Sequence, residues 1–224
     1  MAASDYPKPS VTVDVAIITL RGEELQVLLV KRDLAPYKGR WAIPGGFVHL
    51  AESLDAAARR ELCEETGVTD VYLEQLYTFG EPGRDPRGRV ISVAYIALVP
   101  APVAVEAGSD AREARWWPLR DVPALAFDHE KIAQLALTRL RYKIEYSAVG
   151  FRLLPDCFSL SELQRAYEII LGEPLDKRNF RRRIMEAEVI EPTADLRTGE
   201  GRPARLYRFR RDAVAEVKAR RLFP

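Results

Sequence analysis

The chain has 224 residues, with 34 Lys or Arg, 33 Asp or Glu and 47% hydrophobic residues, and these values exclude a disordered or collagen-like protein. No apolar run reaches the ~18 residues that a membrane-spanning helix needs, and the N-terminus has no secretory signal pattern, so we expect a cytoplasmic protein without a membrane segment. The two cysteines, Cys63 and Cys157, lie far apart and indicate reduced thiols rather than a disulfide framework.

The first half of the chain predicts a mixture of strands and helices. Branched apolar residues predict strands over residues 11–20, 25–32, 71–79, 89–99 and 114–119. Residues 41–46 form a short apolar segment that Pro44 and two glycines terminate. Helices are expected over residues 53–66 and 128–146. Ser53 suits the N-cap of the first helix, and Gly67 follows its last turn.

Three glutamates share one face of the first predicted helix. At 100° per residue, Glu61, Glu64 and Glu65 fall within an arc of roughly 100°. Their mutual repulsion suits a hard divalent cation such as Mg²⁺ or Mn²⁺, which prefers carboxylate oxygens and substrate phosphates. Such a cation would stabilise phosphate charge and lower the pKa of a bound water. The alternative is a solvated acidic helix face, because glutamate is a good helix former.

A 23-residue pattern around this helix favours the metal site. It reads Gly46, five residues, Glu52, seven residues and then Arg60-Glu-Leu-Cys-Glu-Glu-Thr-Gly-Val68, which matches the Nudix box at every specified position. The chain therefore resembles a Nudix hydrolase over about residues 10–146. The resemblance implies an α/β/α sandwich around a mixed sheet and a metal site that acts on a nucleoside diphosphate linked to another group. It assigns metal binding and catalysis to Glu61, Glu64 and Glu65, metal support to Glu52, and a structural ion pair to Arg60.

An arginine-rich loop lies between two of the predicted strands. Residues 77–95, with the sequence Gly80-Glu-Pro-Gly-Arg-Asp-Pro-Arg-Gly88 inside them, resemble the ADP-ribose branch of the Nudix family. Guanidinium groups bind diphosphates through paired N–H donors. The candidates for this contact, with no preference among them, are Arg40, Arg84, Arg87 and Arg89. A solvated basic loop is the alternative. The general base for hydrolysis stays open between the box glutamates, Glu81 and Glu113.

The pattern and the charge change in the C-terminal part. Residues 151–224 carry 16 Lys or Arg against 12 Asp or Glu, whereas residues 1–150 carry 18 against 21. From Ser159 onward we expect a helix, a turn, a second helix over 176–188, and strands over 189–192 and 206–209 around a Gly-rich loop. The sequence therefore predicts two domains, over residues 1–150 and 151–224.

The second of these helices is basic, with five Lys or Arg among the seven residues from Lys177 to Arg183. Arginine and asparagine read guanine and adenine in the major groove, and a basic hairpin after such a helix suits a winged helix-turn-helix. We expect base contacts from Arg178, Asn179 and Arg182, phosphate contacts from Lys177, Arg202 and Arg205, and a flanking position for Arg181. A solvated basic helix face is the alternative.

The two halves together resemble the Nudix-related transcriptional regulators of NAD metabolism over nearly the whole chain. The likeness rests on the Nudix box and on residues 175–182 and 201–209. It implies a homodimer that binds a palindromic DNA operator, represses genes of NAD synthesis or salvage, and is released by ADP-ribose. The intact box also implies hydrolysis of ADP-ribose, so the alternative is an ADP-ribose diphosphatase with an accessory C-terminal domain. A third interpretation keeps DNA binding but takes another nucleotide sugar or a plain sugar as the effector.

Overall fold

The computed structural model describes residues 8–101, 111–197 and 203–210. Its described residues form two compact units, of which the first comprises residues 8–18, 27–97 and 111–136 and the second comprises the rest. None of the helices in this described part of the chain has the length and apolar character needed to cross a membrane.

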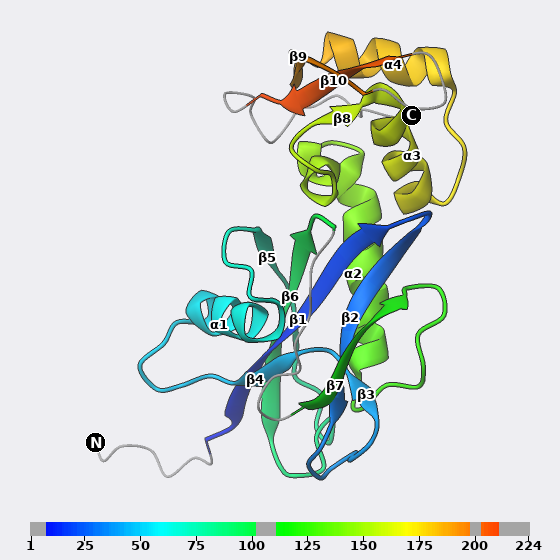
Figure 1. Cartoon of the computed structure of the whole chain (residues 1–224). Coiled ribbons are helices and arrows are strands. Elements are labelled where there is room, and N and C mark those ends of the chain that lie inside the picture. The colour runs from blue at the N-terminus through cyan, green and yellow to red at the C-terminus, as the bar shows by residue number, and fades with distance from the viewer. Residues whose placement is uncertain (1–7, 102–110, 198–202, 211–224) are drawn as a thin grey trace. The chain divides into compact units, whose positions relative to one another are not determined.

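A mixed β-sheet organises the N-terminal part of the chain (Figure 1). Its strands are β1 (Ser10–Arg21), β2 (Glu24–Arg32), β3 (Trp41–Ala42), β4 (Gly45–Phe47), β5 (Tyr72–Phe79), β6 (Val90–Val99) and β7 (Ala111–Pro118). The order is β3-β2-β1-β6-β5, with β4 also paired to β1 and β7 to β2. The central strands β1 and β6 are buried along runs of consecutive residues, which requires cover on both faces of the sheet.

Two helices supply this cover. In Figure 1, α1 (Leu54–Thr66) and the beginning of α2 (His129–Ile144) lie on opposite faces of the sheet. Ser53 accepts a hydrogen bond from the amide of Ala56, and Gly67 ends α1 in the left-handed conformation at φ 67°, so the predicted caps are confirmed. The predicted α/β fold with a mixed sheet is confirmed as well.

The segment at residues 41–46 differs from the prediction in part. The strand β3 ends at Ala42, before Pro44, as expected, but the two glycines begin β4, which pairs antiparallel with β1 through Val13 opposite Gly46. A Cβ at Gly45 would lie 2.3 Å from the carbonyl oxygen of Val13, so glycine is what allows this close pairing. The strand β4 thereby brings Gly46 against the side chain of Glu61 on α1.

The second unit contains the predicted helix-turn-helix and its two-stranded hairpin. Its elements after α2 are a 3₁₀ helix η1 (Ala148–Leu153), β8 (Phe158–Ser159), α3 (Leu160–Leu171), α4 (Lys177–Glu186), β9 (Ile190–Arg197) and β10 (Ala204–Phe209). The sheet order is β8-β10-β9. The predicted order of elements is confirmed, whereas η1 and β8 were not expected. The second helix ends at Glu186 rather than at residue 188, because Glu188 adopts a left-handed φ of 53°.

Candidate functional site

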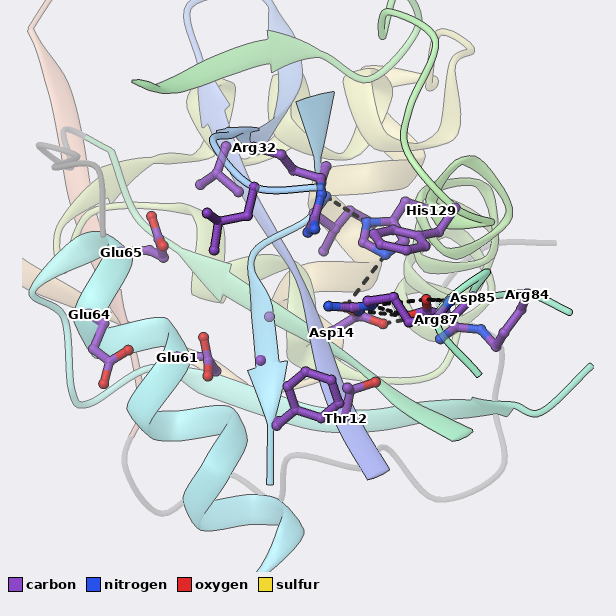
Figure 2. Close-up of a pocket in the computed structure, with 18 of the residues that line it drawn as sticks. Thr12, Asp14, Arg32, Glu61, Glu64, Glu65, Arg84, Asp85, Arg87 and His129 are labelled. Atoms are coloured by element: carbon purple, nitrogen blue, oxygen red, sulfur yellow. Dashed lines mark hydrogen bonds and ion pairs between the residues drawn. The ribbon is translucent and has the colours of Figure 1, made fainter. Parts of the chain in front are cut away.

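A pocket of about 470 Å³ lies beside α1 and β4 in the first unit. Figure 2 shows Glu61, Glu64 and Glu65 projecting from α1 on one side, and Arg84 and Arg87 on the other side together with Asp14, Asp85 and His129. A pocket with opposed carboxylates and guanidinium groups suits an anionic ligand that carries a cation.

The glutamates on the α1 side differ in exposure. Glu61 and Glu65 are buried, at 7% and 8% exposed, whereas Glu64 is exposed. Burial raises the pKa of Glu61, and the neighbouring carboxylates of Glu64 and Asp14 act in the same direction, whereas the hydrogen bond from Arg60 opposes them.

Arg60 links the carboxylates of the Nudix box. Its Nη1 donates to Oε1 of Glu61 at 2.6 Å, and its Nη2 donates to Oε1 of Glu52 at 2.9 Å. The predicted structural ion pair of Arg60 is therefore confirmed. Glu52 does not line the pocket, and its hydrogen bond with Arg60 lowers its pKa to about 2. In this arrangement, Glu52 orients Arg60 against Glu61.

The carboxylate oxygens of the box glutamates are ligands of the kind that a divalent cation prefers, although the three side chains do not converge on a single position. Within the described ranges, no group of three His, Cys, Asp or Glu side chains is close enough together to hold a metal ion. A Cβ at Gly46 would lie 2.2 Å from Oε1 of Glu61, so the glycine leaves this carboxylate its place at the pocket wall. Glu61, Glu64 and Glu65 therefore offer hard oxygen ligands along one wall, and a bound phosphate would complete the set.

Neither loop candidate for the general base lies at the pocket. Glu81 and Glu113 are absent from its lining, and Glu113 forms an ion pair with Lys31 at 3.6 Å. The acidic side chains that line it besides the box glutamates are Asp14 and Asp85.

The four predicted ligand-binding arginines fall into two groups. Arg84 and Arg87 line the pocket, whereas Arg40 and Arg89 are exposed and do not. Arg89 instead donates to the carbonyl oxygen of Gly80 at 2.6 Å.

The two pocket arginines also differ from each other. The side chain of Arg84 is 4% exposed, and it donates to both oxygens of Asp128, at 3.0 and 2.6 Å. The side chain of Arg87 is 40% exposed, donates to Asp85, and stacks 5.2 Å from the ring centroid of Phe47. The charge of Arg84 is thus compensated inside the protein, while Arg87 keeps a face toward the pocket.

Sequence analysis missed Arg32 and Phe127 at this pocket. The guanidinium of Arg32 lies 4.8 Å from the ring centroid of Phe127, and both residues line the cavity. Phe127 has a left-handed φ of 53°, which is unusual for an aromatic residue. The position of Arg32 at the end of a buried strand was the one available signal, because strand ends often carry site residues.

A buried histidine connects the pocket with the start of α2. The amide of Ile43 donates to Nδ1 of His129 at 2.9 Å, so in the neutral ring the proton resides on Nε2. This nitrogen lies 3.6 Å from Oδ1 of Asp14, and the other carboxylate oxygen of Asp14, Oδ2, accepts a hydrogen bond from the hydroxyl of Ser92. His129 therefore joins β1, the loop between β3 and β4, and α2.

Acid should destabilise the first unit through His129. Burial lowers the pKa of His129 below its ordinary value of 6.5, so the unfolded chain binds a proton that the folded protein excludes. The stabilisation is complete above pH 6.5 and is lost as the pH falls toward the folded pKa, by up to about 1.4 kcal/mol per pH unit. Urea unfolding between pH 5.5 and 7.5 measures this slope. His129→Gln should reduce it, and an unchanged slope would contradict the assignment.

The predicted DNA-binding residues lie on α4 and on the hairpin. Phe180 and Ile184 bury one face of α4, so the opposite face is open to solvent. Lys177, Arg178, Arg182 and, on β10, Arg205 are exposed, whereas Asn179 and Arg181 are partly buried and Arg202 lies outside the described residues. Arg181 donates to the hydroxyl of Ser161 on α3 at 3.2 Å. The exposed basic residues of α4 are thus Lys177, Arg178 and Arg182.

Comparison with known proteins covers both parts of the chain. The NUDIX domain family matches residues 11–136, and the NrtR DNA-binding winged helix domain matches residues 150–209. The chain is 43% identical over 210 residues to the "ADPR responsive transcriptional repressor NtrR" of Acinetobacter baylyi, spanning 92% of this chain and 84% of that protein. It is also 43% identical over 127 residues to the "ADP-ribose pyrophosphatase" of Methanocaldococcus jannaschii, over 57% of this chain and 72% of that one.

A solved structure resembles the chain over almost its whole length. Shewanella oneidensis NrtR in complex with a 27mer DNA has a TM-score of 0.84 and 37% identity, covering 95% of this chain and 99% of that one. The Nudix domain of the same relative, in complex with ADP ribose, has a TM-score of 0.57 and 38% identity, over 60% of this chain and 90% of that one. The chain therefore belongs to the NrtR family, in which a Nudix domain is joined to the NrtR-type winged helix domain.

Proposed function

We propose that this protein is a transcriptional repressor of NAD-synthesis or salvage genes that ADP-ribose releases from DNA. The observation that carries the proposal is one chain with two matched parts: a pocket with opposed carboxylates and arginines, and a winged helix with an exposed basic face. Relatives whose names state an ADP-ribose response and a DNA complex support it. Residues 1–150 would form the effector domain and residues 151–224 the DNA-binding domain of a cytoplasmic homodimer.

The effector would lie across the pocket with its diphosphate between the two charged sides. A Nudix domain implies a divalent metal, and we assign it as Mg²⁺ or Mn²⁺ held by Glu61, Glu64 and Glu65. When bound, such an ion neutralises phosphate charge and activates water. Arg87 would contact the diphosphate with its exposed face, and Arg84 would hold Asp14 and Asp128 in place.

On DNA, α4 would enter the major groove of each half of a palindromic operator. Base contacts would come from the outward face of α4, and phosphate contacts from Lys177, Arg202 and Arg205. A dimer with two such helices reads two half-sites, which explains why a palindrome is expected.

Two binding experiments test this function with the full-length protein. Calorimetry in EDTA should show that ADP-ribose binds with higher affinity than AMP or ribose 5-phosphate alone. Selection from a pool of randomised duplexes should yield one palindromic sequence. Failure of both experiments would exclude a ligand-responsive repressor.

The phosphate contacts predict a measurable salt dependence. Lys177 is exposed at the start of α4, and its replacement by alanine should weaken binding to all DNA sequences alike. The slope of log K against log salt should become less negative by about 0.9. Titrations between 50 and 200 mM salt would measure the slope, with Lys38→Ala as a control far from α4 in the sequence. An unchanged slope would contradict a phosphate contact by Lys177.

Hydrolysis of ADP-ribose is a second candidate activity, favoured by the intact box and by the resemblance to an ADP-ribose pyrophosphatase. Replacement of the buried Glu65 by glutamine removes a charged metal ligand without changing side-chain volume. Any Mg²⁺-dependent release of AMP should therefore fall by a factor of about 100 or more. Full activity in Glu65→Gln would refute the assigned ligand.

A further inference from the structure

Two outward-facing arginines on α4 have different surroundings. Arg178 and Arg182 lie one helical turn apart, and both are exposed. Arg182 donates through Nη1 to both carboxylate oxygens of Glu186, at 3.1 and 3.2 Å, and through Nη2 to Oδ1 of Asn179 at 2.8 Å. The side chain of Arg178 makes no hydrogen bond of this kind with any of the residues that the structure describes. Arg182 is thus held from both sides, whereas the side chain of Arg178 stays free to change rotamer.

The arrangement around Arg182 leaves donors for a base. A guanidinium has five N–H donors, so the contacts with Asn179 and Glu186 still leave N–H groups for O6 and N7 of guanine. The two contacts approach from the preceding and the following helical turn and therefore fix the direction of the guanidinium plane. A guanidinium group whose orientation is fixed in this way loses less conformational entropy when it binds a base.

The same bonds change the role expected for Asn179. Asparagine reads adenine by accepting from N6 with its oxygen while its amide donates to N7. Oδ1 of Asn179 accepts a hydrogen bond from Arg182, so the side-chain amide is oriented toward the arginine. Its oxygen and its NH₂ group are therefore not both available to pair with adenine. Asn179 therefore acts on DNA through Arg182.

Glu186 places a negative charge on α4, the helix that is proposed to enter the DNA groove. Its side chain is 59% exposed, and its negative charge opposes DNA binding at every sequence. Its carboxylate accepts hydrogen bonds from Arg182 through both oxygens. A residue that weakens general affinity while orienting one arginine increases the difference between correct and incorrect sequences.

We infer that Arg182 is the guanine-reading arginine of α4 and that Glu186 is a positioning residue that determines its specificity. This inference rests on the proposed DNA-binding function. Asn179 then makes no base contact of its own, and Arg178 contacts DNA with a side chain that can adjust its conformation.

The test compares a duplex selected by the wild-type protein with a scrambled duplex of the same composition. The measured quantity is the ratio of the two affinities at fixed salt, for full-length protein. Glu186→Ala should lower this ratio about tenfold, because it removes the repulsion that both duplexes experience, whereas only the selected duplex loses the oriented arginine. Glu188→Ala is the matched control, because it removes a charge from an exposed residue just beyond α4 and should leave the ratio unchanged.

A double-mutant cycle separates positioning from direct reading by Glu186. Arg182→Ala should lower the ratio at least as far, and Glu186→Ala should cause no further loss in that background. An unchanged ratio in Glu186→Ala, or an equal loss with and without Arg182, would overturn the inference. If the wild-type protein selected no sequence, the proposed function and this inference would both fail. If the wild-type protein bound specifically and Glu186→Ala left the affinity ratio unchanged, this inference would fail while the proposed function would stand.

Discussion

Replacement of Arg84 by methionine should lower the free energy of unfolding of the Nudix domain by about 3 kcal/mol. The arginine is 4% exposed and bonds both oxygens of Asp128, with Asp14 at 3.6 Å. Its removal leaves a carboxylate of Asp14 that is buried without this compensating charge. The loss stays near the lower end of the range for buried pairs, because the Asp128 side chain remains 14% exposed.

Urea unfolding followed by tryptophan fluorescence measures this loss selectively. The chain has three tryptophans, and all of them, Trp41, Trp116 and Trp117, lie in the Nudix domain. Arg89→Met is the control, because Arg89 is exposed and should change the free energy of unfolding by no more than about 0.5 kcal/mol. Equal stability of the two variants would show that Arg84 is not an internal counterion.

The second large effect is expected at Phe180. Its side chain is 1% exposed and packs against the ring of Tyr167 with centroids 5.6 Å apart. Phe180→Ala should destabilise the winged helix domain by about 3–5 kcal/mol. A domain of 60 residues has only about 3–9 kcal/mol of stability, so much of it would be unfolded. DNA binding should be lost, whereas ADP-ribose binding should persist.

The control for this variant lies on the same helix. Met185 is 50% exposed, so Met185→Ala creates no cavity and should leave the winged helix folded. Calorimetry with ADP-ribose and anisotropy with the selected DNA would be measured on both variants. Loss of both activities in Phe180→Ala would contradict separate sites for effector and DNA.

The sequence was most informative where local chemistry decides the structure. The helix α1 begins after a serine cap and ends at a glycine, and both signals act within one turn of the helix. The order of elements from Ser159 to Phe209 was predicted for the same reason, since its breaks are marked by Gly172 and the loop residues.

The roles of the arginines depend on residues far away in the chain. Arg84 finds its partner Asp128 44 residues later, and a linear sequence does not indicate this pairing. Arg40 and Arg89 looked equivalent to Arg87 by composition, but the fold places them outside the pocket. Likewise, β4 pairs with β1 although its glycines suggested a break, because tertiary contacts outweigh local propensity.

ADP-ribose and DNA should bind to the same protein with opposite preference for its conformation. Linkage requires that ADP-ribose weaken DNA binding by the same factor by which DNA weakens ADP-ribose binding. The decisive measurement titrates full-length protein against the selected duplex with and without saturating ADP-ribose, in EDTA so that no turnover occurs. ADP-ribose should weaken DNA binding by about 5- to 150-fold, the usual range of allosteric coupling. Tight and sequence-specific DNA binding that ADP-ribose leaves unchanged would contradict it.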